Sequence, residues 1–122
     1  MSGKILVIED NPDNQKLVAW MLEDESYPFD TVESGEACLE QLQKAEYALV
    51  LPDISLPGID GMEIARRIRS QPLFANLPII ACTAHAAAQE KANICEVGVN
   101  HVITKPFDEM HLKACLQRYL VI

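Results

Sequence analysis

Basic residues are scarce in this chain. Its 122 residues include 10 lysines and arginines against 18 aspartates and glutamates, which gives a formal net charge of -8. Duplex nucleic acid and anionic membranes both attract clusters of Lys and Arg, so neither is expected as a direct partner. The acidity instead leaves open a cation, a basic protein surface, or an acidic site that needs a metal ion.

Long apolar runs are also missing. A membrane-spanning helix needs about 20 consecutive apolar residues, and no stretch of the sequence approaches that length. The segment from Met1 to Lys4 leads directly into a strand-like run and lacks the pattern of a signal peptide. The chain has no G-x-x-x-x-G-K loop, which excludes a GTPase that uses this motif. We therefore expect no membrane insertion, and the cysteines, described next, point to the cytoplasm.

Paired cysteines are the third absence. The four cysteines include no C-x-x-C pair, and each lies in an apolar segment of regular period. This pattern favours reduced cysteines in the core over disulfides or a metal site. The cysteines are Cys38, Cys82, Cys95 and Cys115.

Apolar strands and amphipathic helices alternate along the whole chain. With 49% apolar and 23% charged residues, the composition is that of one globular domain, residues 1–122. The predicted strands are Lys4–Ile8, Tyr27–Val32, Tyr47–Leu51, Ile79–Cys82 and Asn100–Thr104. The predicted helices are Pro12–Glu25, Glu36–Ala45, Gly61–Ser70, Ala86–Glu96 and a last one that begins at Phe107 or Asp108.

Two of these helices carry side chains whose placement can be predicted from their spacing. In the first helix four apolar residues share the expected inner face, and Trp20 lies near its edge, where simple packing is favoured over burial beside Asp53. These four residues are Leu17, Val18, Met21 and Leu22. In the third helix the arginines are expected to point mostly into solvent. They are Arg66, Arg67 and Arg69.

The alternation predicts a three-layer α/β domain with a parallel sheet. Right-handed crossovers place the carboxyl ends of all the strands at one edge, which is where such sheets bind their ligands. The residues at these strand ends are acidic, hydroxylic or basic. They are Glu9, Asp10, Asp53, Thr83 and Lys105.

Asp53 follows the apolar run Leu49–Leu51 and precedes a loop rich in proline and glycine. Aspartate is common in turns, so this segment alone is equally consistent with a turn residue that ends the strand. Three carboxylates at one edge, however, repel each other unless a cation lies among them, and Mg²⁺ binds carboxylates, water and phosphate oxygens. A carboxylate can accept a phosphoryl group, while Lys105 and Thr83 supply a cation and a donor for its oxygens. The edge therefore predicts phosphoryl transfer to Asp53.

Four segments at successive strand ends carry a resemblance to a known family. They are Ile-Glu-Asp-Asn, Asp-Ile-Ser-Leu-Pro-Gly-Ile-Asp-Gly, Cys-Thr-Ala-His-Ala and Thr-Lys-Pro-Phe. In this order they resemble the receiver domain of two-component response regulators, and the match covers the whole chain. The resemblance implies a flavodoxin-like (βα)5 fold, a doubly wound parallel sheet of five strands in the order 2-1-3-4-5.

The resemblance also implies roles for individual residues. Asp53 would accept phosphoryl from a histidine kinase or a histidine phosphotransfer protein. The domain would be a signalling domain that catalyses only its own phosphorylation and dephosphorylation. Phosphorylation would then change the surface near the fourth helix, fifth strand and fifth helix for a downstream protein. The Mg²⁺ ligands would be Glu9, mostly through water, Asp10, Asp53 and the Ser55 carbonyl. The phosphoryl group would contact Ile54, Thr83, Ala84 and Lys105.

Three positions depart from this pattern or stay open. The family usually has an aromatic residue three positions before the lysine, where this chain has Val102, and His101 beside it should face the other side of the sheet. Pro52 removes a donor from an interior strand, so either strand pairing has already ended there or the strand has a functional bulge. His85 is either a solvated loop residue or a group that affects hydrolysis of the aspartyl phosphate.

Two other functions compete with a phosphorylated switch. A phosphorylation-independent interaction module is suggested by Val102. A haloacid-dehalogenase-like phosphatase would also use an aspartyl phosphate, but that family has an Asp-x-Asp pair. Here Asp53 is followed by Ile54 and Ser55, so no second acid stands two residues further on. A chain of this length leaves no room for an output domain, so we expect a stand-alone regulator or the receiver of a hybrid kinase.

Overall fold

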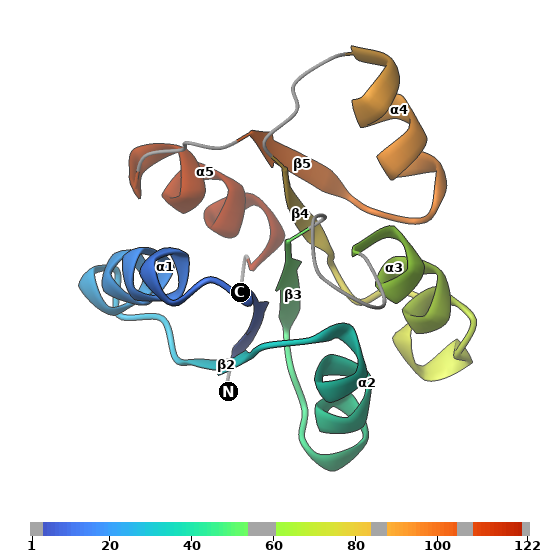
Figure 1. Ribbon diagram of the computed structural model, residues 1–122, viewed down its shortest axis with the longest axis horizontal. Helices are drawn as coiled ribbons and strands as arrows, with labels where there is room; N and C mark the ends of the chain where they lie inside the picture. Colours follow the sequence, from blue (N-terminus) through green and yellow to red (C-terminus); the bar gives the residue numbers. More distant parts are fainter. Residues whose placement is uncertain (1–3, 54–60, 84–87, 105–108, 121–122) are drawn as a thin grey trace.

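The computed structural model describes residues 4–53, 61–83, 88–104 and 109–120, which form strands alternating with helices (Figure 1). The strands are β1 (Ile5–Ile8), β2 (Phe29–Val32), β3 (Leu49–Pro52), β4 (Ile80–Thr83) and β5 (His101–Thr104). The helices are α1 (Pro12–Asp24), α2 (Gly35–Lys44), α3 (Gly61–Arg69), the 3-10 turn η1 (Pro72–Phe74), α4 (Ala88–Glu96) and α5 (Glu109–Tyr119). The predicted starts of the last two helices lie outside the described residues.

All strand pairs are parallel, as predicted. Hydrogen-bonded ladders run through β2-β1-β3 and through β4-β5. The two ladders meet at the bridges Val50–Ile79 and Asp53–Cys82. The strand order is therefore 2-1-3-4-5, which confirms the predicted doubly wound fold.

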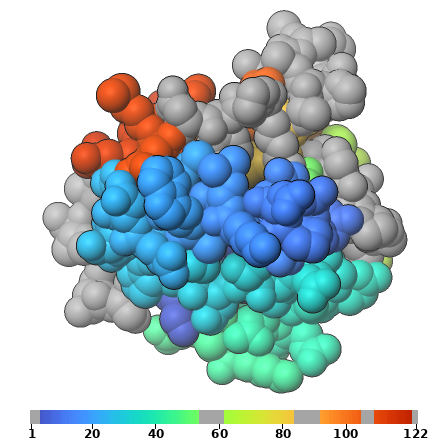
Figure 2. Space-filling model, turned by 60° about the vertical axis from the view of Figure 1, so that its left-hand side comes forward, coloured from blue at the N-terminus to red at the C-terminus, as the bar shows by residue number. Residues whose placement is uncertain are grey.

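Each face of the sheet has its own hydrophobic core, because alternate side chains of a strand point to opposite faces. Ile5 and Val7 pack with residues of α1 and α5, whereas Leu6 and Ile8 pack with residues of α2, α3 and α4. The same division of the helices is visible in Figure 1. From the side of α1, Figure 2 shows this helix on the surface with residues of α5 next to it. No helix among the described residues is long and apolar enough to cross a membrane.

The first helix differs from its prediction on one side and at its end. Val18, Met21 and Leu22 are buried, but Leu17 is 47% exposed and Trp20 is 57% exposed, so neither packs as expected. The helix ends in a Schellman motif, in which Tyr27 donates to the Leu22 carbonyl (2.9 Å). Ser26 takes the position with positive φ (62°) that is usually glycine.

Strand β2 also starts later than predicted, at Phe29 instead of Tyr27. Pro28 precedes it, and its carbonyl accepts a hydrogen bond from the backbone N–H of Ile5 (3.0 Å).

The cysteines are all free, and Cys38, Cys82 and Cys115 are buried as expected. Cys95 is exposed, so its predicted place in the core is wrong.

Arg69 is the exception among the arginines of α3. Arg66 and Arg67 are exposed and pair with Glu63 at 3.3 Å and 3.1 Å. The Arg69 guanidinium instead turns inward and donates to neutral oxygens of two other segments, η1 and the connection between α4 and β5. Its acceptors are the Phe74 carbonyl (2.9 Å), the Gly98 carbonyl (3.0 Å) and Asn100 Oδ1 (2.8 Å).

Gly98, whose carbonyl accepts one of the hydrogen bonds from Arg69, is expected to tolerate no side chain. Its φ is +103°, and an added Cβ would lie 2.6 Å from Cγ of Arg69. We predict that Gly98→Ala lowers the free energy of unfolding by about 1–3 kcal/mol, because alanine is strained at this φ and the arginine must move. Chemical denaturation measures the loss. Gly35→Ala, at a helix start without positive φ, is the control, and an equal loss in both variants would contradict the prediction.

Candidate functional site

The end of β1 delivers two carboxylates to the edge of the sheet. The Glu9 backbone N–H still donates to the Val32 carbonyl (3.0 Å), so the ladder with β2 continues to this residue. Glu9 is 3% exposed, whereas Asp10 is exposed to solvent. The buried carboxylate accepts a hydrogen bond from the backbone N–H of Asn11 (3.2 Å).

Asn11 then caps α1 and fixes the turn that holds these acids. Its Oδ1 accepts from the backbone N–H groups of Asp13 (2.9 Å) and Asn14 (3.2 Å), with Pro12 at the first helical position. One turn later, Gln15 Nε2 donates to the Glu9 carbonyl. Gln15, one helical turn beyond Asn11, was not among the predicted site residues.

Asp53 lies directly after β3 and is 6% exposed. Its backbone N–H donates to the Ile8 carbonyl (3.0 Å), which fixes it beside the end of β1. On its other side it bridges Cys82 of β4. The next residue of β4 is Thr83, which is 2% exposed. The topology therefore brings Glu9, Asp53 and Thr83 together on three adjacent strands, as predicted.

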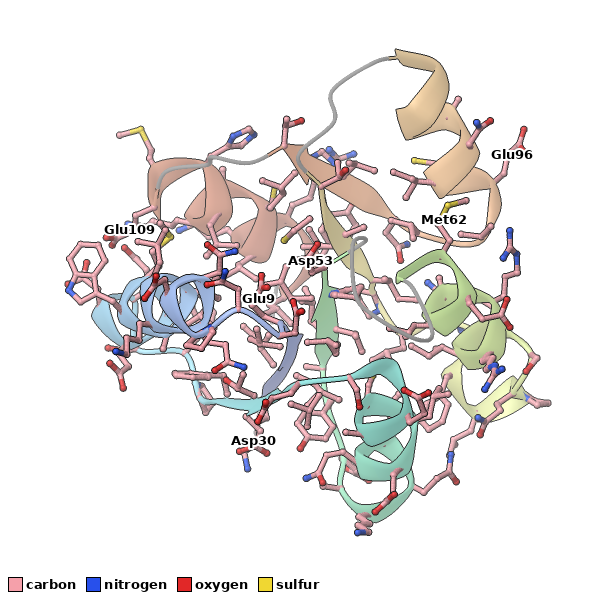
Figure 3. All side chains as sticks on the ribbon, viewed as in Figure 1. Glu9, Asp30, Asp53, Met62, Glu96 and Glu109 are labelled. Carbon is pink, nitrogen blue, oxygen red and sulfur yellow. The ribbon has the colours of Figure 1, made fainter. Side chains whose placement is uncertain are left out.

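Three carboxylates converge at this edge. Oxygens of Glu9, Asp10 and Asp53, one from each, all lie within 4.8 Å of one another. Figure 3 shows Glu9 beside Asp53 near the middle of the molecule. Because Glu9 and Asp53 are both buried, their charges repel in a region with little water to screen them. A hard divalent cation with oxygen ligands relieves this repulsion, so the donor set fits Mg²⁺.

A second acidic group, formed by Asp24, Glu25 and Glu109, lies between α1 and α5. The repulsion among its carboxylates is reduced in a different way. Lys113 Nζ lies 3.4 Å from a Glu25 carboxylate oxygen. Hydrogen bonding with Asp24 and then Glu25 raises the pKa of Glu109 to about 7, so this carboxyl group binds a proton more readily. Lys113 thus offsets part of the charge of this group, and Asp24 is exposed to solvent, unlike the buried Glu9 and Asp53.

The fifth strand confirms the expected direction of two side chains. His101 faces α5, where its ring lies 6.3 Å from that of Tyr119. Val102 points to the opposite face and packs against the core formed with α2, α3 and α4. The position at which the family usually has an aromatic residue is therefore filled by a small apolar side chain.

The remaining predicted site residues lie outside the described part of the chain. They are Ile54, Ser55, Ala84, His85 and Lys105. Lys105 follows Thr104, the last residue of β5, which pairs with Thr83. The register thus leads the chain to the expected edge, and the roles of these residues stay predictions.

Known proteins resemble this chain in sequence. The family model of the response regulator receiver domain matches residues 5–117. The sensor protein GacS of Pseudomonas syringae pv. syringae is 38% identical over 112 residues, which cover 89% of this chain and 12% of GacS. This chain thus spans about an eighth of the length of that relative.

Two solved structures extend the likeness to the fold. The receiver domain of sensor histidine kinase PA1611 from Pseudomonas aeruginosa PAO1, which has a magnesium ion in its active site cleft, is 34% identical with a TM-score of 0.90, and 98% of each chain is covered. The BeF3-activated receiver domain of Klebsiella pneumoniae RstA is 29% identical with a TM-score of 0.90 over 98% of this chain and 100% of that one. With its fold and family match in agreement, this chain belongs to the response regulator receiver domains of two-component systems.

Proposed function

We propose that Asp53 is the phosphoacceptor of this receiver domain. The observation that carries the proposal is the convergence of Asp53 with Glu9 and Asp10 within 4.8 Å. Asp53 can act as the nucleophile toward a phosphoryl group, and its burial beside the strand end fixes its orientation. Thr83, at the end of the neighbouring strand, places a hydroxyl donor where the phosphoryl oxygens of an aspartyl phosphate would lie.

The donor set supports Mg²⁺ as the cofactor. Glu9, Asp10, Asp53 and the Ser55 carbonyl would hold the ion, which when bound neutralises charge on the phosphoryl oxygens. Lys105 would add a second positive charge, and Ile54, Thr83 and Ala84 would complete the contacts to the oxygens. The magnesium ion in the similar PA1611 receiver supports this assignment.

The partner that best suits this site is a protein phosphohistidine, on a histidine kinase or a histidine phosphotransfer protein. The match to GacS, a sensor protein, and to the receiver of a sensor histidine kinase supports this choice. We place the response at the surface of α4, β5 and α5, where a downstream protein would bind, and the protein in the cytoplasm. Its chemistry would be limited to its own phosphorylation and dephosphorylation.

Beryllofluoride, which mimics a phosphoryl group on aspartate, tests the proposal directly. With Mg²⁺ present, we predict that it shifts the amide NMR resonances of residues that follow β1, β3 and β4, because these segments would surround the phosphoryl group. The titration compares Mg²⁺ alone with Mg²⁺ plus beryllofluoride. If neither addition shifts any resonance, the phosphorylation-independent interaction module becomes the better interpretation.

A further inference from the structure

Pro52 lies inside the paired sheet. It is the last residue of β3, is buried, and pairs with Ile8 of β1. The next residue, Asp53, still bonds to the Ile8 carbonyl and bridges Cys82. The expectation that pairing has ended at Pro52 is therefore wrong, and the described residues of β3 contain no extra residue that would form a bulge.

The missing N–H of Pro52 faces β4. In a parallel strand, the N–H groups of alternate residues point to the same neighbouring strand. Asp53 donates to β1, whereas Val50 donates to the Pro78 carbonyl of the β4 side (3.0 Å). Residue 52 therefore faces β4 as well. The bridges Val50–Ile79 and Asp53–Cys82 share one register, which places the Ile80 carbonyl opposite residue 52. Proline has no N–H to donate to it.

This gap divides the sheet between two sets of site residues. The β2-β1-β3 half carries Glu9, Asp10 and Asp53, whose oxygens converge. The β4-β5 half carries Thr83 and leads to Lys105. The two halves are joined by the hydrogen bonds between β3 and β4. One of these bonds, or rungs, is missing at Pro52, immediately before Asp53.

We propose that Pro52 is a positioning residue that lets β4 adjust relative to Asp53 when a phosphoryl group is bound. This inference rests on the proposed function of Asp53. A complete ladder would hold Thr83 at its position in the unphosphorylated protein, and any movement toward the phosphoryl oxygens would stretch the added bond. Without the bond, β4 is held beside Asp53 by the Asp53–Cys82 bridge but not by the position before it, so Thr83 can approach more easily while the metal ligands on the other half stay in place. In this chain Val102 replaces the aromatic residue that is usual in the family. The proposed adjustment is therefore made by the strands of the sheet and not by an aromatic side chain.

Pro52→Val restores the donor and tests the proposal. Valine is close to proline in size and favours strands, and Pro52→Ala restores the same donor with a smaller side chain. Leu51→Val is the matched control, since Leu51 pairs with Val7 and its N–H faces β1, so the number of bonds to β4 is unchanged. NMR coupling across the new hydrogen bond, from the amide of residue 52 to the Ile80 carbonyl, shows whether the rung has formed.

We expect the two variants at Pro52 to separate two affinities. The Kd for Mg²⁺ should stay within about twofold of that of the unmodified protein, because its proposed side-chain ligands lie on the β2-β1-β3 half. The Kd for beryllofluoride at saturating Mg²⁺ should rise roughly two- to tenfold, the range that one net backbone hydrogen bond provides. Phosphorylation from a small phosphodonor should slow by a similar factor. A purely structural role would not produce this split.

Several results would overturn the inference. One is a rung that forms while both affinities stay unchanged. A second is the absence of coupling to the Ile80 carbonyl in both variants, which would refute the register argument. A third is an equal loss of Mg²⁺ and beryllofluoride affinity, which would indicate general damage. If the unmodified protein binds no beryllofluoride, the proposed function itself fails, and the two failures are thereby distinguished.

Discussion

Asp53→Asn is expected to abolish the incorporation of acid-labile phosphate from a small phosphodonor. The substitution keeps the size of the side chain but replaces the nucleophilic carboxylate oxygen by a neutral amide. It also removes one of the three carboxylates that converge at the site. Because that change relieves repulsion, the variant should unfold in Mg²⁺-free buffer at a temperature no lower than the unmodified protein. Loss of labelling in a folded protein is therefore the predicted result.

A variant from the second acidic group provides the control for this experiment. Asp24→Asn removes the same charge from the group formed with Glu25 and Glu109, and we expect it to incorporate phosphate like the unmodified protein. Labelling is measured by phosphate release in acid and by mass after reaction with Mg²⁺ and phosphodonor. Undiminished labelling of Asp53→Asn would mean that another residue accepts the phosphoryl group.

The convergence on Asp53 could be predicted because it follows from topology. Apolar runs of strand length that alternate with helices specify a parallel sheet, and right-handed crossovers place all strand ends at one edge. Once Glu9 and Asp53 were assigned to strand ends, their proximity required no knowledge of side-chain packing. The structure confirms this, with both residues buried at the predicted edge.

Features that depend on tertiary contacts could not be predicted in the same way. Arg69 follows the exposed Arg66 by three residues on α3, so helical spacing alone predicts the same exposure for both. Only the hydrogen bonds to Gly98 and Asn100 turn the Arg69 guanidinium inward. Leu17 lies on the predicted inner face of α1, yet it is half exposed because the packed face is narrower than the apolar pattern. At the end of the same helix, Ser26 occupies a position where the sequence offers no glycine to mark the turn.

Pro52 shows how structure can reverse an interpretation based on residue type. Proline is rare inside a sheet because it cannot donate to the ladder, and this rule favoured an end to pairing before Asp53. Pairing with β1 nevertheless continues, since this neighbour receives its bonds from Leu51 and Asp53 in a parallel register. The strand register determines which neighbour the N–H of residue 52 would face. It would face β4, so the proline removes a hydrogen bond to β4 and none to β1.

The second large effect is expected at the metal site, where Asp10→Asn should weaken Mg²⁺ binding by at least roughly 10-fold. Loss of a group that only supports a metal ligand commonly costs roughly 10- to 100-fold, and Asp10 is proposed as a ligand itself. Asp10 is exposed, so its substitution should leave the core and the free energy of unfolding little changed. The measurement is an Mg²⁺ titration followed by amide NMR. Phosphorylation at low Mg²⁺ should fall in parallel and recover in part when Mg²⁺ is raised.

Asp24→Asn again separates a specific loss from a general effect of charge. Both variants change the net charge from -8 by the same single unit, so long-range attraction of a dication changes equally in both. The acidic group at Asp24 already includes Lys113 at 3.4 Å from Glu25, whereas burial of Glu9 and Asp53 makes a bound cation far more favourable at the sheet edge. Equal weakening of Mg²⁺ binding by the two variants would therefore contradict a specific site at Asp10. A loss confined to Asp10→Asn would establish that Asp10 takes part in binding the ion at the edge where it converges with Glu9 and Asp53.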